Sequence, residues 1–460
     1  METPRDIALE SLDQRSLTAS RLSSTTSREP SSNRKAVLVA MASFMVTFTG
    51  CGLTFAFGVY QELYESLEGP FANASPATID LIGTLAVSLM TMGAPFASAW
   101  TKAYSPRTVT LIGGVIFALG NVLASFSQQL WHFIFTQGII LGIGTCLSYI
   151  PAVTVAPGWF NEKRALAMGV VLSGTGVGGV FWAPVIRLLN ESIGFRHALQ
   201  LTGGVAFLLI SAAGMILSWD AESERRIALE RQTRSSRTGA FQVPLVNWRV
   251  ARSKKFLAHA LSALFQAAAY YGPIYFLSAY ARTLGYSAAA GANLIAISNA
   301  SSAGGKVVLG YVADRFGRLN TLFLCTLVST FITLGLWLPS TLLGPNTASK
   351  ALFITFAITY GIFAGAYVSL FPTSLMEVFG AQNFASVNGF LYMARGCGAL
   401  LGTPITGSLV RNGKVGSGVA LGSPLGYRNS CTMVGALLAA ATVTSLWLRL
   451  EAAGISKFRA

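Results

Sequence analysis

The sequence predicts an all-α membrane protein with twelve transmembrane helices, and two observations carry this prediction. First, 52% of the 460 residues are apolar and only 11% are charged, whereas an ordinary soluble domain carries roughly 25% charged residues. A single soluble core could not hide so much apolar surface. Second, apolar runs near the roughly 20 residues that a bilayer requires recur along the chain. The 47 glycines suit close contact between helices in a membrane.

Twelve apolar runs, separated mostly by short polar gaps, give the expected spans. They cover 37–60, 79–100, 108–126, 132–155, 165–186, 198–219, 256–279, 289–310, 320–339, 351–372, 387–409 and 430–449. The long gap is central and charged, and it divides the spans six and six. The expected parts are a disordered cytoplasmic tail (1–36), an amino-terminal half (37–219), a cytoplasmic linker loop (220–255), a carboxy-terminal half (256–450) and a cytoplasmic tail (451–460).

The charge distribution gives the expected orientation in the membrane. The net charge is +15, but the basic residues lie in the gaps between apolar runs, which argues against nucleic-acid binding. Most of the 33 Lys and Arg residues fall on the side of the amino terminus. Since basic loops stay in the cytoplasm, both termini are expected there. No apolar region of the signal-peptide kind precedes the first span, so a cleavable signal peptide is not expected. The plasma membrane is the default location.

The cysteines predict neither a metal site nor a disulfide framework. Four of the five lie inside apolar runs, the fifth opens one, and no CxxC or metal-ligand spacing occurs. No phosphate-binding loop is present either, so no cofactor is expected. The five are Cys51, Cys146, Cys325, Cys397 and Cys431.

The string GYVADRFGR at 310–318 is the sharpest motif. Gly310 allows close helix packing, Asp314 can cap or pair across a helix end, and Gly317 permits a tight turn. Arg315 and Arg318 would stay in cytoplasmic water. The string resembles the signature loop of the major facilitator superfamily, which implies that these five residues gate transport by latching the two halves together. The corresponding loop of the first half, 101–108, has no acidic residue.

Two further strings resemble the monocarboxylate-transporter-like family, especially its fungal branch. They are PGWFNEKRALAMG at 157–169 and SGTGVGG at 173–179, and the strings at 57–61, 142–152 and 377–380 agree. The resemblance covers 37–450. It implies the major facilitator fold, in which two pseudo-symmetric six-helix halves rock about a central site. The glycine run at 174–179 is explained by tight helix packing.

One departure from that family concerns the eighth expected span, 289–310. In this span the best-studied members of the family place an Asp and, four residues later, an Arg toward the pore. Here Ser302 stands at the acidic position and Lys306 at the basic one. The cation is kept and the acid is lost, which disfavours the usual monocarboxylate–proton symport and leaves proton coupling open.

Two cations inside expected spans, Lys306 and Arg395, are the main candidates for substrate contact, because an ionisable residue in a membrane is costly and marks a functional site by default. Each belongs to a polar stripe that should face a cavity. The alternatives are an ammonium that reaches the headgroups for Lys306 and bonds to backbone carbonyls for Arg395. Tyr270 and Tyr271 are weaker candidates. The full expected binding set is Asn299, Ser302, Lys306, Asn388, Tyr392, Arg395, Tyr149 and Gln266.

These residues predict a secondary-active transporter for a small organic acid or an acidic, amphipathic secondary metabolite, with export slightly favoured. The alternative is a non-transporting membrane sensor for an organic acid, which the short tail and linker disfavour. An enzyme is not expected, since no nucleophile–base set appears. Asn73 and Asn190 lie in Asn-x-Ser sequons within expected outer loops and are candidate glycosylation sites.

Overall fold

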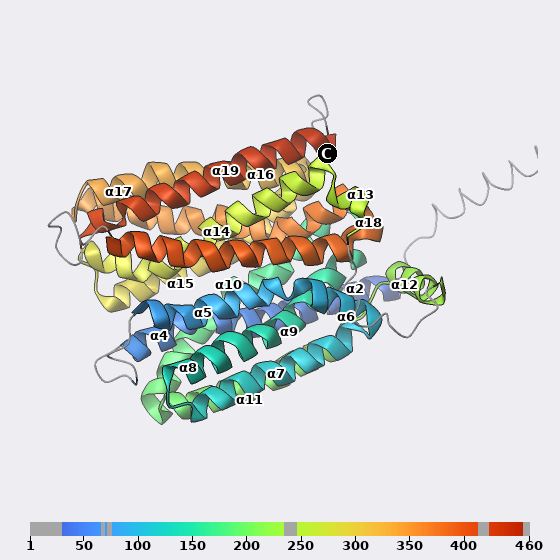
Figure 1. Ribbon diagram of the computed structural model, residues 1–460, viewed down its shortest axis with the longest axis horizontal. Helices are drawn as coiled ribbons and strands as arrows, with labels where there is room; N and C mark the ends of the chain where they lie inside the picture. The colour runs from blue at the N-terminus through green and yellow to red at the C-terminus, as the bar shows by residue number, and fades with distance from the viewer. Residues whose placement is uncertain (1–29, 66–69, 71–75, 234–245, 413–422, 454–460) are drawn as a thin grey trace, which may run out of the picture. The chain divides into compact units, whose positions relative to one another are not determined.

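The computed structural model describes residues 30–65, 70, 76–233, 246–412 and 423–453, and these contain helices but no strand (Figure 1). Most of the expected amino-terminal tail and the sequon residue Asn73 lie outside the described residues. Val39–Ala460 form one compact unit, and the residues up to Leu38 belong to another. The architecture below is that of the larger unit.

The helices follow the expected spans in order. In the amino-terminal part they are α2 (Pro30–Val46), η1 (Thr47–Cys51), α3 (Gly52–Phe55), α4 (Phe57–Glu65), α5 (Pro76–Met92), α6 (Ala94–Ala103), α7 (Pro106–Phe126), α8 (Leu130–Phe133), η2 (Ile134–Ile140), α9 (Leu141–Val155), η3 (Ala156–Trp159), α10 (Arg164–Ile193) and α11 (Phe195–Ile216). The linker carries α12 (Ala221–Thr233) and α13 (Trp248–Ala251). The rest are α14 (Lys254–Thr283), α15 (Ala288–Phe316), α16 (Arg318–Ile332), η5 (Thr333–Trp337), α17 (Leu338–Leu342), α18 (Thr347–Asn412), η6 (Pro424–Tyr427) and α19 (Arg428–Ala453).

Local signals explain where several of these helices begin and end. Ser253 and Ser287 cap α14 and α15, because their hydroxyls accept hydrogen bonds from the backbone N–H groups three residues later at 3.2 Å. Gly317 separates α15 from α16 with φ 96°, a conformation that glycine adopts without strain. Gly380, with φ 71°, bends α18 into two arms at one residue.

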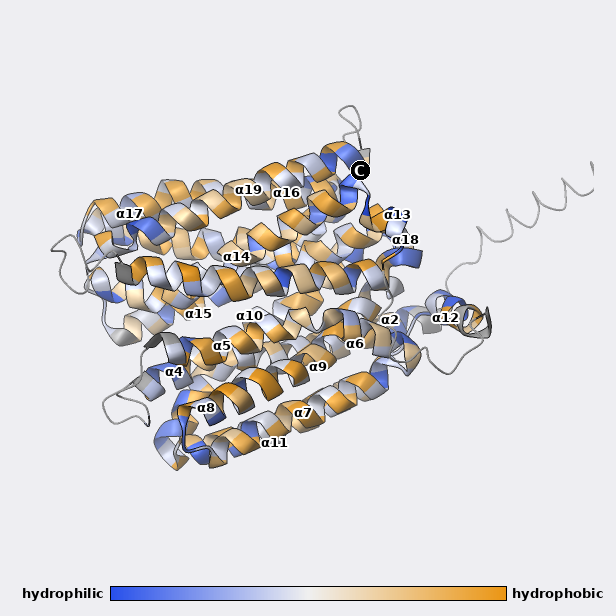
Figure 2. Ribbon diagram, in the orientation of Figure 1, coloured by the Kyte–Doolittle hydropathy of each residue, from blue (hydrophilic) through white to orange (hydrophobic). Residues whose placement is uncertain are grey.

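Eight helices in the described chain are long and apolar enough to cross a membrane, or nine if the bent pair Thr78–Met92 and Ala94–Ala103 forms one span. The bent α18 counts only once in this tally. Helices α14 and α15, with 30 and 29 residues, are long enough but carry more small and polar side chains. Apolar residues run along the helices in Figure 2, and hydrophilic ones concentrate near their ends. An all-α multi-pass membrane protein is confirmed, and the count of twelve stays a prediction.

Two groups of helices pack against each other. In the amino-terminal group α7 packs on α9 and α11, and in the carboxy-terminal group α14 packs on α18 and α19. The groups lie in the lower and upper parts of Figure 1, and they meet where α10 contacts α15 and α5 contacts α18. Along α10 and α15 the backbones touch. A Cβ atom added at Gly310 would lie 2.6 Å from the Ala165 carbonyl oxygen, and one at Gly169 would collide with the Lys306 carbonyl oxygen.

Several helices extend beyond the expected membrane spans. Helix α2 begins at Pro30 rather than at residue 37, and α19 extends to Ala453. The linker contains the 13-residue helix α12 and is not entirely a loop. Asn190 lies within α10 rather than in an outer loop, because that helix continues past the apolar stretch that predicted its end.

Candidate functional site

A polar cavity lies between the two groups, and side chains from both line it. Two are basic, four are tyrosines, and most others are apolar. The lining residues are Cys51, Phe55, Met90, Thr91, Tyr149, Thr175, Tyr270, Tyr271, Lys306, Val368, Tyr392 and Arg395. The space not filled by protein atoms is about 370 Å³, but it is so narrow in this conformation that it admits only about one water molecule. The cavity must widen before it can hold an organic molecule.

Lys306 enters the cavity from α15. Its side chain is 2% exposed, and its Nζ donates a hydrogen bond to Thr175 Oγ1 of α10 at 2.5 Å. The ammonium is therefore buried between α10 and α15 and is not exposed at the surface of the protein. The ion pairs between described residues do not include Lys306.

Arg395 enters from α18 and is 3% exposed. Its Nη1 donates to Gln266 Oε1 at 3.1 Å, and this side-chain amide is its hydrogen-bond partner among the described residues. The guanidinium lies 5.0 Å from the Phe371 ring centroid and 5.5 Å from that of Tyr367. Such cation–π contacts stabilise the cation without neutralising it. Among the described residues, the hydrogen-bond partners of both buried cations are neutral side chains.

The tyrosines complete the cavity and connect the two groups. The hydroxyls of Tyr149 and Tyr392 lie 3.3 Å apart, and their rings pack edge to face at 6.0 Å. On another side Phe55 packs against Tyr271 at 6.2 Å. The weaker candidates Tyr270 and Tyr271 therefore line the cavity. Aromatic faces around a cationic centre suit a planar, partly apolar molecule.

Four of the eight predicted binding residues line the cavity: Lys306, Arg395, Tyr149 and Tyr392. The other four lie around it. Gln266 holds Arg395, Ser302 lies beside Tyr270, and the Asn388 amide donates to Thr154 Oγ1 at 3.3 Å. Asn299 packs against the glycines of α10.

Six lining residues were not predicted from the sequence: Cys51, Phe55, Met90, Thr91, Thr175 and Val368. Small or apolar side chains of this kind are ordinary in a membrane span, so their positions give no signal in the sequence. Thr175 in particular lies within the glycine run at 174–179, which already has an explanation in helix packing.

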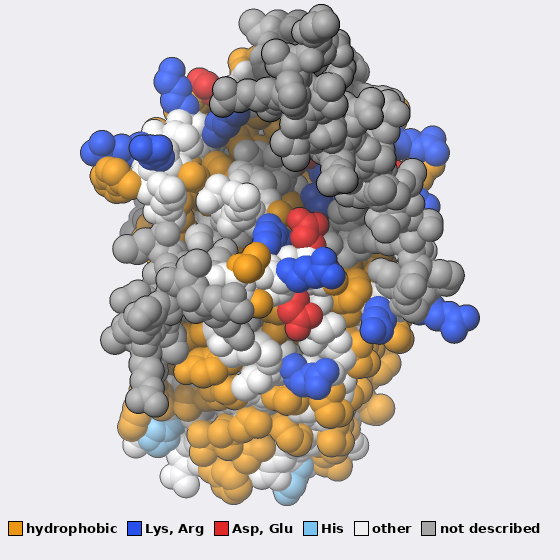
Figure 3. Space-filling view, turned by 90° about the vertical axis from the view of Figure 1, so that its right-hand side faces the viewer, with side chains coloured by type: hydrophobic (Ala, Val, Ile, Leu, Met, Phe, Trp, Pro, Cys, Tyr) orange, Lys and Arg blue, Asp and Glu red, His pale blue; other side chains and the backbone are white. Residues whose placement is uncertain are grey.

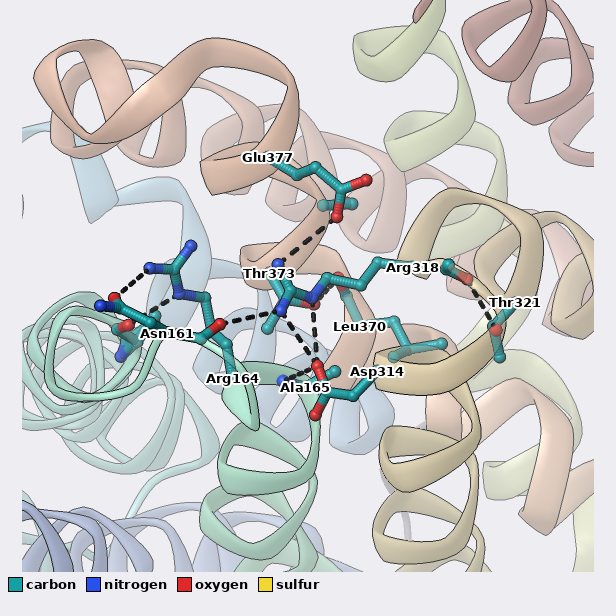
Figure 4. A network of polar contacts seen from close by, with 12 residues as sticks. Asn161, Arg164, Ala165, Asp314, Arg318, Thr321, Leu370, Thr373 and Glu377 are labelled. Atoms are coloured by element: carbon teal, nitrogen blue, oxygen red, sulfur yellow. Dashed lines mark hydrogen bonds and ion pairs between the residues drawn. The ribbon is translucent and has the colours of Figure 1, made fainter. Parts of the chain in front are cut away.

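At one end of the molecule, here called the Asp314 end, the motif at 310–318 joins the two groups (Figure 4). The Asp314 carboxylate accepts hydrogen bonds from the backbone N–H groups of Ala165 at 3.0 Å and Leu166 at 2.8 Å. These groups begin α10, where the helix dipole favours a negative charge. The network ties the carboxy-terminal group to the amino-terminal group.

Arg318 extends this network to a third element. It pairs with Asp314 at 3.0 Å and with Glu377 of α18 at 3.5 Å, and it donates to the Asn161 carbonyl at 3.3 Å. Arg315 stays outside the network and lies 4.6 Å from the Tyr311 ring centroid. Figure 3 looks onto this end, where basic and acidic side chains alternate in the middle of the face.

At the opposite end, called the Glu62 end, one carboxylate bridges the two groups. Glu62 of α4 pairs with Arg187 of α10 and with Arg282 of α14, each at 3.2 Å. Arg187 belongs to the same group as Glu62, whereas Arg282 belongs to the other. The cavity is therefore bounded at both ends by contacts between the groups.

Comparison with known proteins agrees with this architecture. The family model of the Major Facilitator Superfamily matches residues 36–403. An MFS-type transporter of Gibberella moniliformis is 29% identical over 360 residues, which are 78% of this chain and 81% of that protein. An agnestins efflux protein of Paecilomyces divaricatus is 25% identical over 377 residues, 82% and 81% of the two chains.

An animal relative is similar to about the same extent. Monocarboxylate transporter 12 of Xenopus laevis is 28% identical over 385 residues, which are 81% of this chain and 82% of that protein. Both fungal MFS-type transporters and a monocarboxylate transporter are thus among the relatives, as the strings at 157–179 predicted. The chain belongs to the Major Facilitator Superfamily.

Proposed function

We propose that this protein is a secondary-active transporter of an organic anion that carries a planar, largely apolar ring system. The observation that carries the proposal is the pair of buried cations, Lys306 and Arg395, which face one cavity and whose hydrogen-bond partners in the described part of the chain are neutral. Burying a charge without compensation is costly. A carboxylate or acidic phenol on the substrate would supply the missing negative charge, and the tyrosines would contact its rings.

The relatives support transport and suggest a class of substrate. One relative is named for the efflux of agnestins, and another is named as a monocarboxylate transporter. An acidic secondary metabolite combines these features, and export is the proposed direction. Relatives named as transporters favour transport over catalysis, and none is named as a sensor.

The proposed mechanism is alternating access by rocking of the two groups. The narrow cavity bounded at both ends corresponds to an intermediate closed to both sides. The proposed orientation places the Asp314 end in the cytoplasm, because the basic tail and linker lie on that side of the sequence pattern. The plasma membrane is the proposed location, and Asn73 and Asn190 stay candidate glycosylation sites.

The substrate is tested by untargeted mass spectrometry of cells with and without the protein, inside and outside. We expect an acidic aromatic compound to redistribute, and its direction gives import or export. Arg395→Gln and Lys306→Met should each reduce that redistribution at least tenfold, since a charge-assisted hydrogen bond is worth about 1.5–3 kcal/mol. Lys350→Met, which removes a cation lying over Tyr286 and away from the cavity, is the matched control. Full transport by both site variants at normal membrane levels contradicts the assignment.

A further inference from the structure

The single hydrogen-bond partner that the described residues offer to the Lys306 ammonium is the Thr175 hydroxyl. The two residues belong to different groups, Thr175 to α10 and Lys306 to α15. Thr175 Oγ1 accepts from Lys306 Nζ at 2.5 Å and donates its own hydrogen to the Leu172 carbonyl at 2.8 Å. This inner bond orients the hydroxyl so that a lone pair faces the ammonium.

The helix contact around Thr175 fixes the distance between these two groups. On either side of Thr175 along α10, Gly169 and Gly176 lie against the backbone of α15. A Cβ atom added at Gly176 would lie 2.5 Å from the Asn299 carbonyl oxygen. Since the backbones touch, the hydroxyl meets the ammonium only while α10 and α15 keep this register.

The ammonium is left with donors to spare. A lysine has three hydrogen-bond donors, and Thr175 uses one of them. Both residues line the cavity. An anion that enters from the cavity therefore finds Lys306 already oriented with free donors, and its negative charge attracts the ammonium away from the neutral Thr175 hydroxyl.

We propose that Thr175 is a positioning residue that holds Lys306 in the empty cavity and is displaced when an anion binds. The inference rests on the proposed function, because it assumes that the ligand is anionic. Displacement releases a bond between α10 and α15, so binding of the substrate loosens the contact across which the groups move. Thr175 thereby lowers the affinity for the anion and raises the rate of turnover.

The pairing is tested first without any ligand, through a double-mutant cycle of thermal stability in the purified full-length protein. The variants are Thr175→Val, Lys306→Met and both together, with Thr175→Ser as the conservative replacement. We expect Thr175→Val to lower Tm because it leaves a buried ammonium unpaired. The double variant should regain much of that loss, and Thr175→Ser should resemble the wild type. Additive effects of the two substitutions overturn the pairing.

The displacement is tested with benzoate as the anionic probe and benzamide as its uncharged match. Uptake into proteoliposomes gives KM and kcat, and the rise of Tm with concentration gives affinity. For Thr175→Val we expect KM for benzoate to fall about tenfold, the factor expected for one lost competing hydrogen bond to a charge. The kcat should fall as well, and Thr175→Ser should restore both. A purely structural role predicts lower activity at unchanged KM, and direct substrate contact predicts a higher KM.

The two tests separate the possible failures. In one outcome the Tm changes of Thr175→Val and Lys306→Met are not additive, but the wild type does not bind benzoate. This would keep Thr175 as the partner of Lys306 and contradict an anionic aromatic substrate. Benzoate binding that is unchanged in Thr175→Val would support the proposed function and overturn the displacement. Equal binding of benzamide and benzoate would contradict the role of the charge in both.

Discussion

The two ends of the molecule are bridged by carboxylates of similar geometry and very different burial. The Asp314 side chain is 8% exposed and that of Arg318 is 14% exposed. At the other end Glu62, Arg187 and Arg282 are 47%, 42% and 53% exposed. An exposed ion pair is worth about 0–1 kcal/mol, whereas removing one partner from a buried pair costs about 3–5 kcal/mol. The Asp314–Arg318 pair lies within one group, but the same buried carboxylate accepts hydrogen bonds from the start of α10 at Ala165 and Leu166. We therefore expect the Asp314 end to open at a higher cost than the exposed Glu62 end.

Asp314→Asn should give the largest effect, because it removes the charge that holds Ala165, Leu166 and Arg318 together. Transport should fall at least tenfold for a loss of about 2–3 kcal/mol. Cys51 lines the cavity and can report its accessibility. In Asp314→Asn, a membrane-impermeant maleimide applied at the Asp314 end should alkylate Cys51 faster than in the wild type. Mass spectrometry measures the alkylation. Asp220→Asn is the matched control. The Asp220 carboxylate accepts a hydrogen bond from the Ser223 backbone N–H at the start of α12, which is a local contact three residues along the chain. Equal alkylation in wild type and Asp314→Asn would show that this network does not close the Asp314 end.

Arg318→Met should have an intermediate effect. It removes the contacts with Asp314, Glu377 and the Asn161 carbonyl, but it leaves Asp314 bonded to the start of α10. We expect transport to fall about three- to tenfold, which corresponds to about 0.7–1.4 kcal/mol, the net contribution of an ordinary hydrogen bond. Arg315→Met serves as the control, because Arg315 only stacks on Tyr311. If Arg318→Met and Arg315→Met lose transport equally, the net charge at the Asp314 end matters for transport and the hydrogen bonds of Arg318 do not.

Glu62→Gln should have the smallest effect, with transport changed less than about twofold because all three side chains are half exposed. Salt offers a sharper measurement. Alkylation of Cys51 from the Glu62 end should rise in the wild type as ionic strength increases, since the Glu62 pairs are screened. The same series in Glu62→Gln should be flat. If Cys51 alkylation in Glu62→Gln still depended steeply on ionic strength, the salt effect would come from other charges.

The sequence predicts the Asp314 end and the two cavity cations well, for physical reasons. Asp314 lies in a string whose glycines and charges fit a helix–turn–helix junction, and charges such as Lys306 and Arg395 are too costly in a membrane to be accidental. The Glu62 bridge could not be predicted, because Glu62 and Arg282 fall just outside the expected spans 37–60 and 256–279 and no motif connects them. Thr175 was missed since a hydroxyl between glycines is also explained by packing.

The break expected between the spans 351–372 and 387–409 falls at Gly380, where one residue with φ 71° turns the chain between two helical arms. The linker was harder to predict. The helix α12 lies in a stretch that is polar on all sides, so it has no apolar stripe that would predict it.

The glycine contact between α10 and α15 bears on the speed of the cycle. At Gly169 and Gly310 the opposing backbone occupies the space of a side chain, so no side chain interlocks at these two positions. We expect sliding there to need little unpacking. The polar bonds between the groups should then set the rate, so that single substitutions among them alter the rate while the fold is kept.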